Sequence, residues 1–278
     1  MEALFEIGGK YGSVSETDGY RFHDRFELLL VRGGQGSLVL DGELLPLSRG
    51  ALVLIPPGAL HLAAPLPKEA FRRTVVRFDP ARLADYSSGQ TPLAGLFSEE
   101  KRFLLLPEEE TAEIEKLLGR CETKDACFGG DLRRNMAFLE LLVRTGELLA
   151  SGRFANGQAA ISRERKRMEP LTAFIREHPE RSLSLEAVAE EFHYNKNYLS
   201  RVFKGATGIS VGDYITAVRI SEAAGCLSRG MGVRESGEAA GFRNNSNYIS
   251  TFHRLMGLSP GQYRQRVRAK AGGRSAGL

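Results

Sequence analysis

The chain contains the stretch SLEAVAEEFHYNKNYLSRVFKGATGISVGDY at residues 184–214 and a second version of it, GVRESGEAAGFRNNSNYISTFHRLMGLSPGQY, at residues 232–263. Four residues of the first copy recur 49 residues later: Phe203, Gly208, Ser210 and Tyr214 return as Phe252, Gly257, Ser259 and Tyr263. Ala189 returns as Gly237 only 48 residues later, which makes the turn of the second copy one residue longer. A matched period of this length indicates a duplicated supersecondary unit.

Each copy predicts a short helix, a turn and a second helix with one apolar face. In the first copy Ser184 can cap the first helix, and Asn195 can cap a second helix over residues 196–206. The inward-facing residues of the second helices have helical spacing. They are Leu199, Val202 and Phe203 in the first copy, and Tyr248, Thr251, Phe252 and Leu255 in the second.

The outer faces of the two second helices carry cationic, amide and hydroxyl side chains. A short helix braced by another, with such an outer face, is what recognition of the DNA major groove requires. We therefore predict that the DNA-binding residues are Lys196, Asn197, Ser200, Arg201 and Lys204 in the first copy and Arg243, Asn244, Asn245, Ser246, Asn247, Ser250 and Arg254 in the second. A predicted helix over residues 211–228 joins the copies, and at about 1.5 Å per residue it is roughly 27 Å long. Two recognition helices so joined can reach major grooves about one DNA turn apart.

These residues resemble the DNA-binding domain of the AraC/XylS family of bacterial transcription regulators. The resemblance rests on LxxVAxxF…NYLSRVFK…TGIS…YI…RI and on FxxxxGLSPGQYR at residues 252–264, and it covers roughly residues 165–268. It implies a transcription regulator that acts with RNA polymerase.

Two features depart from the family pattern. The family usually has an aliphatic residue and Ala where this chain has Ser236-Gly237, and an interior Gly costs about 1 kcal/mol relative to Ala. This predicts a looser second unit. The family usually has an aromatic residue and an Arg where this chain has Asn247 and Ser250, which leaves fewer cationic contacts to bases in the second unit.

Composition and charge separate the chain into two parts. A length of 278 residues predicts two domains, and no apolar run approaches the 18 residues of a membrane span. Residues from Arg163 onward carry 19 Lys and Arg against 11 Asp and Glu, whereas residues 1–162 have a net charge of −4. A basic second half beside a mildly acidic first half predicts a polyanionic partner for the second half alone.

The compartment is predicted from the thiols and from the start of the chain. Three scattered cysteines, Cys121, Cys127 and Cys226, fit reduced, buried thiols in a cytoplasmic protein rather than a disulfide framework. The first residues lack the pattern of a signal peptide.

The first 80 residues predict a small antiparallel barrel or jelly roll. Apolar runs at residues 26–31, 37–40, 51–55 and 73–78 are separated by turn signals, and Asp41-Gly42 is a strong hairpin signal. The motifs Gly50-x5-Pro56-x-Gly58-x2-His61 and His23-x3-Glu27-x6-Gly34 resemble those of cupins, the sensor domain of many AraC-type regulators. The predicted fold is therefore a cupin-like barrel with flanking helices, followed by an all-α domain of two helix-turn-helix units.

The cupin-like motifs place four polar residues as a tentative effector-binding set: Arg21, His23, Glu27 and His61. Metal-binding cupins have a histidine where this chain has Arg21, which cannot bind a metal. His23, Glu27 and His61 could still form a two-His-one-carboxylate metal site. We favour a pocket for an organic effector over a metal site. A sequence motif can be kept because the fold needs it, even where the chemistry that it supports in other proteins is absent. Arg21 suits an anionic or hydroxyl-rich ligand such as a sugar, although a salt bridge from Arg21 to Glu27 is an equal alternative.

Two helices are predicted between the halves, over residues 107–122 and 131–150. The second places Leu132, Met136, Leu139, Leu142, Val143 and Leu149 on one stripe, which either packs on the barrel or pairs two subunits, as in regulators that the chain resembles. The predicted organisation is a sensing and dimerisation domain (1–150), a linker (151–166), a DNA-binding domain (167–268) and a disordered tail (269–278).

The chain lacks a catalytic constellation: it has no phosphate-binding Gly loop, no Cys-x-x-Cys pair and no nucleophile elbow. The alternative to a regulator is a metal-dependent cupin enzyme, an isomerase or dioxygenase, with a helical appendage. A scaffold that does not bind DNA would leave the duplicated basic motif unexplained. We therefore predict a cytoplasmic, sequence-specific DNA-binding protein without a cofactor. It is expected to be an effector-responsive activator and a homodimer.

Overall fold

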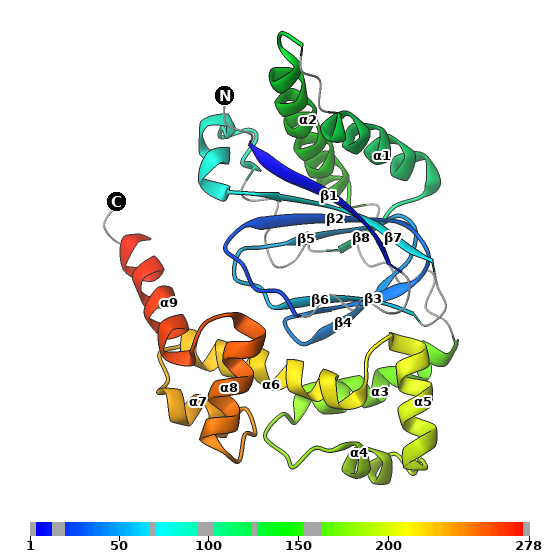
Figure 1. Ribbon diagram of the computed structural model, residues 1–278, viewed down its shortest axis with the longest axis vertical. Helices are drawn as coiled ribbons and strands as arrows, with labels where there is room; N and C mark the ends of the chain where they lie inside the picture. Colours follow the sequence, from blue (N-terminus) through cyan, green and yellow to red (C-terminus); the bar gives the residue numbers. More distant parts are fainter. Residues whose placement is uncertain are drawn as a thin grey trace.

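The computed structural model describes residues 4–12, 20–66, 70–93, 103–123, 127–152 and 163–274. In the described residues, the first half is built of two β-sheets with two α-helices and a short 3-10 helix, and the second half is helical (Figure 1). The strands are β1 (Phe5–Gly12), β2 (Phe26–Gly33), β3 (Gly36–Leu40), β4 (Glu43–Leu47), β5 (Ala51–Ile55), β6 (His61–Pro65), β7 (Phe71–Phe78) and β8 (Phe103–Leu105). The helices are η1 (Pro80–Tyr86), α1 (Glu108–Glu122), α2 (Gly130–Ala150), α3 (Arg163–Glu177), α4 (Leu185–Glu191), α5 (Lys196–Thr207), α6 (Val211–Ser228), α7 (Val233–Ala239), α8 (Asn245–Met256) and α9 (Pro260–Arg274).

Two antiparallel sheets face each other, as the predicted barrel or jelly roll requires (Figure 1). One has the strand order β1-β7-β2-β5-β8 and the other β4-β3-β6. The Asp41-Gly42 hairpin is confirmed: Leu40 pairs with Glu43, and both turn residues have positive φ, as in a type I′ turn. Alternating residues of the strands, such as Leu29, Val53 and Ala63, fill the space between the sheets with apolar side chains.

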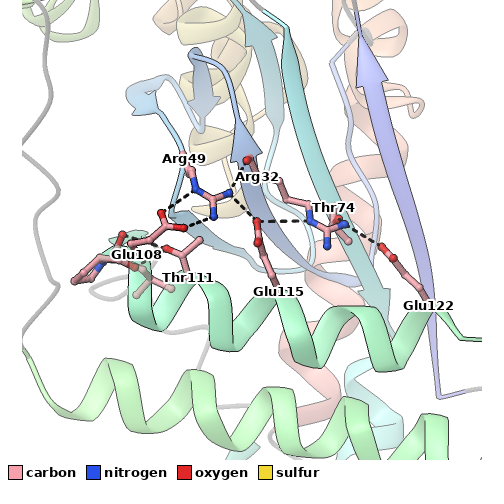
Figure 2. A network of polar contacts seen from close by, with 9 residues as sticks. Arg32, Arg49, Thr74, Glu108, Thr111, Glu115 and Glu122 are labelled. Carbon is pink, nitrogen blue, oxygen red and sulfur yellow. Dashed lines mark hydrogen bonds and ion pairs between the residues drawn. The ribbon is translucent and has the colours of Figure 1, made fainter.

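Helices α1 and α2 cover the outer face of the five-stranded sheet (Figure 1). Phe138 of α2 stacks on Phe5 of β1 with ring centroids 4.5 Å apart. Charged groups hold α1 at the edge of this core, as Figure 2 shows. The Arg49 guanidinium lies between Glu108, at 2.6 Å, and Glu115, at 2.9 Å, and it donates to the Arg32 carbonyl at 2.8 Å. The helix pair is thereby fixed to the barrel.

The two faces of α2 have different surroundings, and the single stripe predicted from the sequence is wrong in part. Leu142 and Leu149 are buried in the core between α2 and the sheet. Leu132 is 48% exposed, Met136 57% and Val143 42%, while Leu139 is partly buried. The stripe therefore divides into core residues and an outer apolar face.

The helical half confirms the duplicated unit. Helices α4 and α5 form the first unit, α7 and α8 the second, and α6 joins them as predicted. Two predicted boundaries are wrong. Residues 163–166 belong to α3 rather than to a linker, and residues 153–162 lie outside the described residues. The tail is helical to Arg274, because the Gln, Arg, Ala and Lys residues that follow Tyr263 favour helix; residues 275–278 are not described.

The three-stranded sheet packs directly against the helical half (Figure 1). Val39, Leu62 and Ala64 share an apolar cluster with α3, α4, α5 and α6. The buried Tyr214 hydroxyl of α6 donates to the Gly42 carbonyl at 3.0 Å. At the end of α5, a Cβ on Gly208 would lie 2.5 Å from the Pro65 carbonyl oxygen, so only glycine allows this approach.

A cleft of about 330 Å³ remains beside this contact, between the hairpin of β3 and β4 and helices α6 and α9. All three cysteines are free thiols, and Cys127 is exposed rather than buried as predicted. Over the residues described, the helices are too short or too polar to cross a membrane.

Candidate nucleic-acid interface and ligand site

The first helix-turn-helix unit is fixed by the two caps that the sequence predicts. The Ser184 hydroxyl accepts a hydrogen bond from the Ala187 amide at 3.2 Å. The Asn195 side chain accepts from the amides of Asn197 and Tyr198, at 3.0 and 3.3 Å. Leu199 and Phe203 are fully buried, so α5 has one fixed outer face.

That outer face presents most of the predicted DNA-binding residues of the first copy. Asn197, Arg201 and Lys204 are exposed, and Ser200 is half-buried. The Arg201 guanidinium lies 6.0 Å from the centre of the Tyr198 ring, a cation–π arrangement. Lys196 is also exposed, but its ammonium group pairs with Glu186 of α4 at 2.6 Å.

The second unit is held by a contact that explains the unusual Ser236-Gly237 pair. Tyr248 of α8 is fully buried, and a Cβ added to Gly237 would lie only 2.6 Å from its ring. The Tyr248 hydroxyl lies 3.0 Å from the Ser236 hydroxyl. The glycine therefore makes room for an aromatic ring where the first copy has the smaller Leu199. This packing opposes the looseness expected from an interior glycine.

The outer face of α8 presents mostly small polar groups. Its exposed residues include Asn245, Ser246, Asn247, Ser250 and Arg254, and Arg243 is exposed in the turn before the helix. The Asn244 side-chain oxygen accepts from the Asn247 amide at 2.9 Å and thereby caps α8. The Asn247 side-chain oxygen in turn accepts from Thr251 at 3.3 Å. Two of the predicted base-contacting oxygens are thus used within the unit.

The two units are tied to each other as well as to α6. Arg219 of α6 donates to the carbonyls of Pro179 and Arg181, at 3.2 and 2.9 Å, in the loop before α4. A Cβ on Gly241, in the turn of the second unit, would lie 2.1 Å from the same Pro179 carbonyl oxygen. The relative placement of the two recognition helices is therefore set by direct contacts.

In the barrel, the structure brings His23, Glu27 and His61 together at one end of the interior. The Glu27 carboxylate is 2% exposed; His23 Nε2 lies 3.1 Å from its Oε2 and His61 Nε2 3.7 Å from its Oε1. Arg21 pairs with His61 through two backbone hydrogen bonds, of 2.8 and 3.0 Å, so the two side chains lie on the same face. The sequence analysis missed Arg77, whose Nε donates to Glu27 Oε2 at 2.7 Å. The two-residue spacing from the inward-facing Val75 indicates that Arg77 faces the interior, but it does not indicate the pairing with Glu27.

The two imidazoles are held in one orientation. His23 Nδ1 lies 3.0 Å from the Arg25 carbonyl and His61 Nδ1 3.1 Å from the Ala59 carbonyl. Each Nδ1 therefore lies beside a backbone carbonyl, and each Nε2 is directed at Glu27. Burial raises the pKa of Glu27, but the interactions with His23, His61 and Arg77 outweigh it and hold that pKa well below its usual range. Glu27 is therefore an anion at neutral pH.

The possible metal ligands, His23, Glu27 and His61, have donor atoms within 4.8 Å of one another. The surroundings fit a metal poorly. The Arg77 guanidinium already forms an ion pair with Glu27, with Nε 2.7 Å from Oε2, and its positive charge would repel a divalent cation. His61 Nε2 is buried and makes no hydrogen bond to any residue in the part of the chain that the structure describes. Two imidazoles, a carboxylate and the Arg77 guanidinium offer polar groups for hydrogen bonds to an organic molecule.

Residues 20–24 connect this cluster to the helical half. Arg21 and His23 belong to the cluster, whereas the alternate residues contact α6 and α9. The Tyr20 hydroxyl donates to the Asp213 carbonyl at 3.1 Å, and Phe22 packs edge-on against Tyr263 at 5.6 Å. Asp24 forms an ion pair with Arg266 of α9. One extended segment thus contacts both the candidate ligand site and helices α6 and α9.

Comparisons with known proteins match both halves. Residues 12–142 match the family model of the AraC-like ligand-binding domain, and residues 188–266 match that of a helix-turn-helix domain. The transcriptional activator RhaR of Klebsiella pneumoniae is 26% identical over 90% of this chain and 88% of its own length. YtdP of Bacillus subtilis, an HTH-type transcriptional regulator, is 38% identical over 32% of this chain, and the match spans only 12% of YtdP. A crystal structure of an apo ToxT variant from Vibrio cholerae, 16% identical, covers 95% of this chain and 97% of ToxT with a TM-score of 0.40.

A ligand-binding barrel joined to a duplicated helix-turn-helix unit defines a class of DNA-binding regulators that respond to effectors. The chain belongs to the AraC/XylS family of transcription regulators. Because the relatives that match along most of its length are named as regulators, the enzyme alternative is rejected.

Proposed function

We propose that this chain is a cytoplasmic transcription activator that binds two successive major grooves of double-stranded DNA and responds to a small polar effector. The observation that carries the proposal is the pair of capped recognition helices, α5 and α8, each with a buried inner face. The opposite face of each helix is directed to solvent. It carries Asn197, Arg201 and Lys204 on α5, and Asn245, Ser246 and Arg254 on α8. Capping and core packing leave these two polar faces as the groove-facing surfaces.

The experiment for DNA binding is selection of sites from random duplexes with the full chain, followed by titration at several salt concentrations. A selected site should be bound more tightly than random DNA. The logarithm of the affinity should fall linearly with the logarithm of the salt concentration, because Lys and Arg displace counterions from phosphates. Equal affinity for selected and random duplexes would contradict sequence-specific regulation.

The effector is proposed to bind at His23, Glu27 and His61, with Arg21 and Arg77 at the same cluster. Its chemistry is inferred from the groups: imidazoles and guanidinium groups suit hydroxyl or carboxylate groups, as in a sugar or sugar acid. Binding there would move Arg21 or His23, and residues 20–24 would carry that change to α6 and α9 through Tyr20, Phe22 and Asp24.

A reporter assay tests this effector site. Arg21→Ala and His61→Ala should abolish the transcriptional response while leaving affinity for the selected site intact, since neither residue lies in α4–α9. A normal response in both variants would place the effector elsewhere, for example in the cleft beside α6.

The partner at α2 is proposed to be a second copy of the chain. The outer face of Leu132, Met136, Leu139 and Val143 has spacings of four, three and four residues, as in a helix pair. Three of these side chains are more than 40% exposed. A dimer would place two chains on adjacent sites and raise the apparent affinity through effective concentration. RNA polymerase is proposed as the further partner because RhaR, a relative that spans most of the chain, is named as an activator.

A further inference from the structure

An exposed isoleucine on the second recognition helix, Ile249, lies outside the apolar core of the unit. Among the residues that the structure describes, the exposed large apolar side chains are Tyr86, Phe128, Leu132, Met136, Val143, Tyr198 and Ile249. Three of them belong to the outer face of α2. Ile249 lies on α8 and is 37% exposed, while the core of the second unit is filled by Tyr248, Phe252 and Leu255.

Ile249 lies on the outer face of α8, among polar side chains. Ser246, one turn before it, and His253, one turn after it, are both exposed, as is the adjacent Ser250. An exposed β-branched residue is less favourable in a helix than Ala or Leu, and it adds apolar surface to an otherwise polar face. A ligand that covers Ile249 would offset this cost.

The duplication shows which position Ile249 occupies relative to DNA. With the 49-residue offset, Ile249 corresponds to Ser200 and Ser250 corresponds to Arg201. The helices α5 and α8 begin at equivalent asparagine caps and end at equivalent left-handed glycines, Gly208 and Gly257. Where the first unit presents Ser and Arg, the second therefore presents Ile and Ser.

The major groove offers one apolar group for such a side chain. The edges of the base pairs display hydrogen-bond donors and acceptors, and thymine alone adds a 5-methyl group. We propose that Ile249 contacts the 5-methyl group of a thymine in the half-site bound by the second unit. The inference rests on the proposed DNA-binding function and adds a base preference to it: the first unit recognises by hydrogen bonds and the second partly by an apolar contact.

Deoxyuridine tests this directly, because it lacks only the methyl group of thymine. The full chain is titrated with its selected site, in which each thymine is replaced in turn by deoxyuridine. One replacement in the second half-site should weaken wild-type binding about fourfold, the effect of burying one methyl-sized group. Ile249→Ala should bind the thymine and deoxyuridine duplexes equally, whereas Ile249→Val should keep most of the difference.

The matched control is deoxyuridine in the half-site of the first unit, where wild type and Ile249→Ala should respond alike. The inference is wrong if no thymine of the second half-site matters, or if Ile249→Ala keeps the full deoxyuridine penalty. It is also wrong if Ile249→Ala changes only transcription with purified RNA polymerase, since Ile249 would then contact protein. Failure of the DNA-binding proposal is distinct, because no selected site would then exist.

Discussion

Replacing Gly237 tests whether the second unit is built around the ring of Tyr248. In an exposed helix interior, Gly→Ala stabilises by up to about 1 kcal/mol. At Gly237 the new Cβ would lie 2.6 Å from the Tyr248 ring, which cannot easily retreat. That ring contacts Phe242 and Phe252 at 5.1 and 5.8 Å, and its hydroxyl lies 3.0 Å from that of Ser236. Overpacking of this kind costs about 1–3 kcal/mol. Gly237→Ala should therefore destabilise the unit by about 1 kcal/mol net.

Native-state hydrogen exchange of the α7 and α8 amides in the full chain is the suitable measurement, because it gives a local opening free energy in a protein of two domains. The control is Gly205→Ala in α5, where nothing lies within 4 Å of the added Cβ. That variant should slow exchange in the first unit. The pair Gly237→Ala with Tyr248→Leu should recover part of the loss by removing the clash. If Gly237→Ala slows exchange as Gly205→Ala does, the packing argument is refuted.

Three further predictions concern the interfaces and the ligand site. Arg201→Ala should cost about 1–3 kcal/mol of binding free energy on the selected site and relax base preference in one half-site, whereas Lys204→Ala should weaken binding to all sequences alike and lower the salt slope by about one. Equal losses of affinity on selected and random DNA for Arg201→Ala would contradict its role in base recognition. Met136→Glu should sediment as a folded monomer that binds single sites but not paired sites cooperatively, and a dimer of unchanged affinity would show that α2 is not the interface. Glu27→Gln should destabilise the barrel at pH 7, and its difference from wild type in unfolding free energy should shrink as the pH falls below about 4.3, the usual carboxyl pKa. The reason is that the pKa of Glu27 is lowered in the folded protein, so this carboxylate stabilises the fold only while it is ionised. A difference between Glu27→Gln and wild type that does not depend on pH would contradict this.

The sequence predicted the helical half well because its signals are local. Ser184, Asn195 and the 49-residue repeat specify where helices begin and which faces are buried, and the structure places each cap as expected. The hairpin at Asp41-Gly42 was predictable for the same reason, since its two residues determine the turn by themselves.

Features that depend on distant contacts were not predictable. Ser236-Gly237 looked like a weakness because its partner, Tyr248, lies in the next helix of the unit. Leu142 and Val143 are neighbours in one apolar stripe, yet only the packed sheet decides that the first is buried and the second 42% exposed. Arg77 joined the candidate site through strand pairing of β2 with β7, which no motif encodes.

One chain is expected to place its two recognition helices in successive major grooves. Methylation-protection footprinting of the Met136→Glu variant on a single selected site measures this, because that variant binds as a single chain if α2 is the dimer interface. We expect two protected major-groove segments on one face of the duplex, with centres about 10–10.5 base pairs apart. A single protected segment, or two on opposite faces, would contradict it.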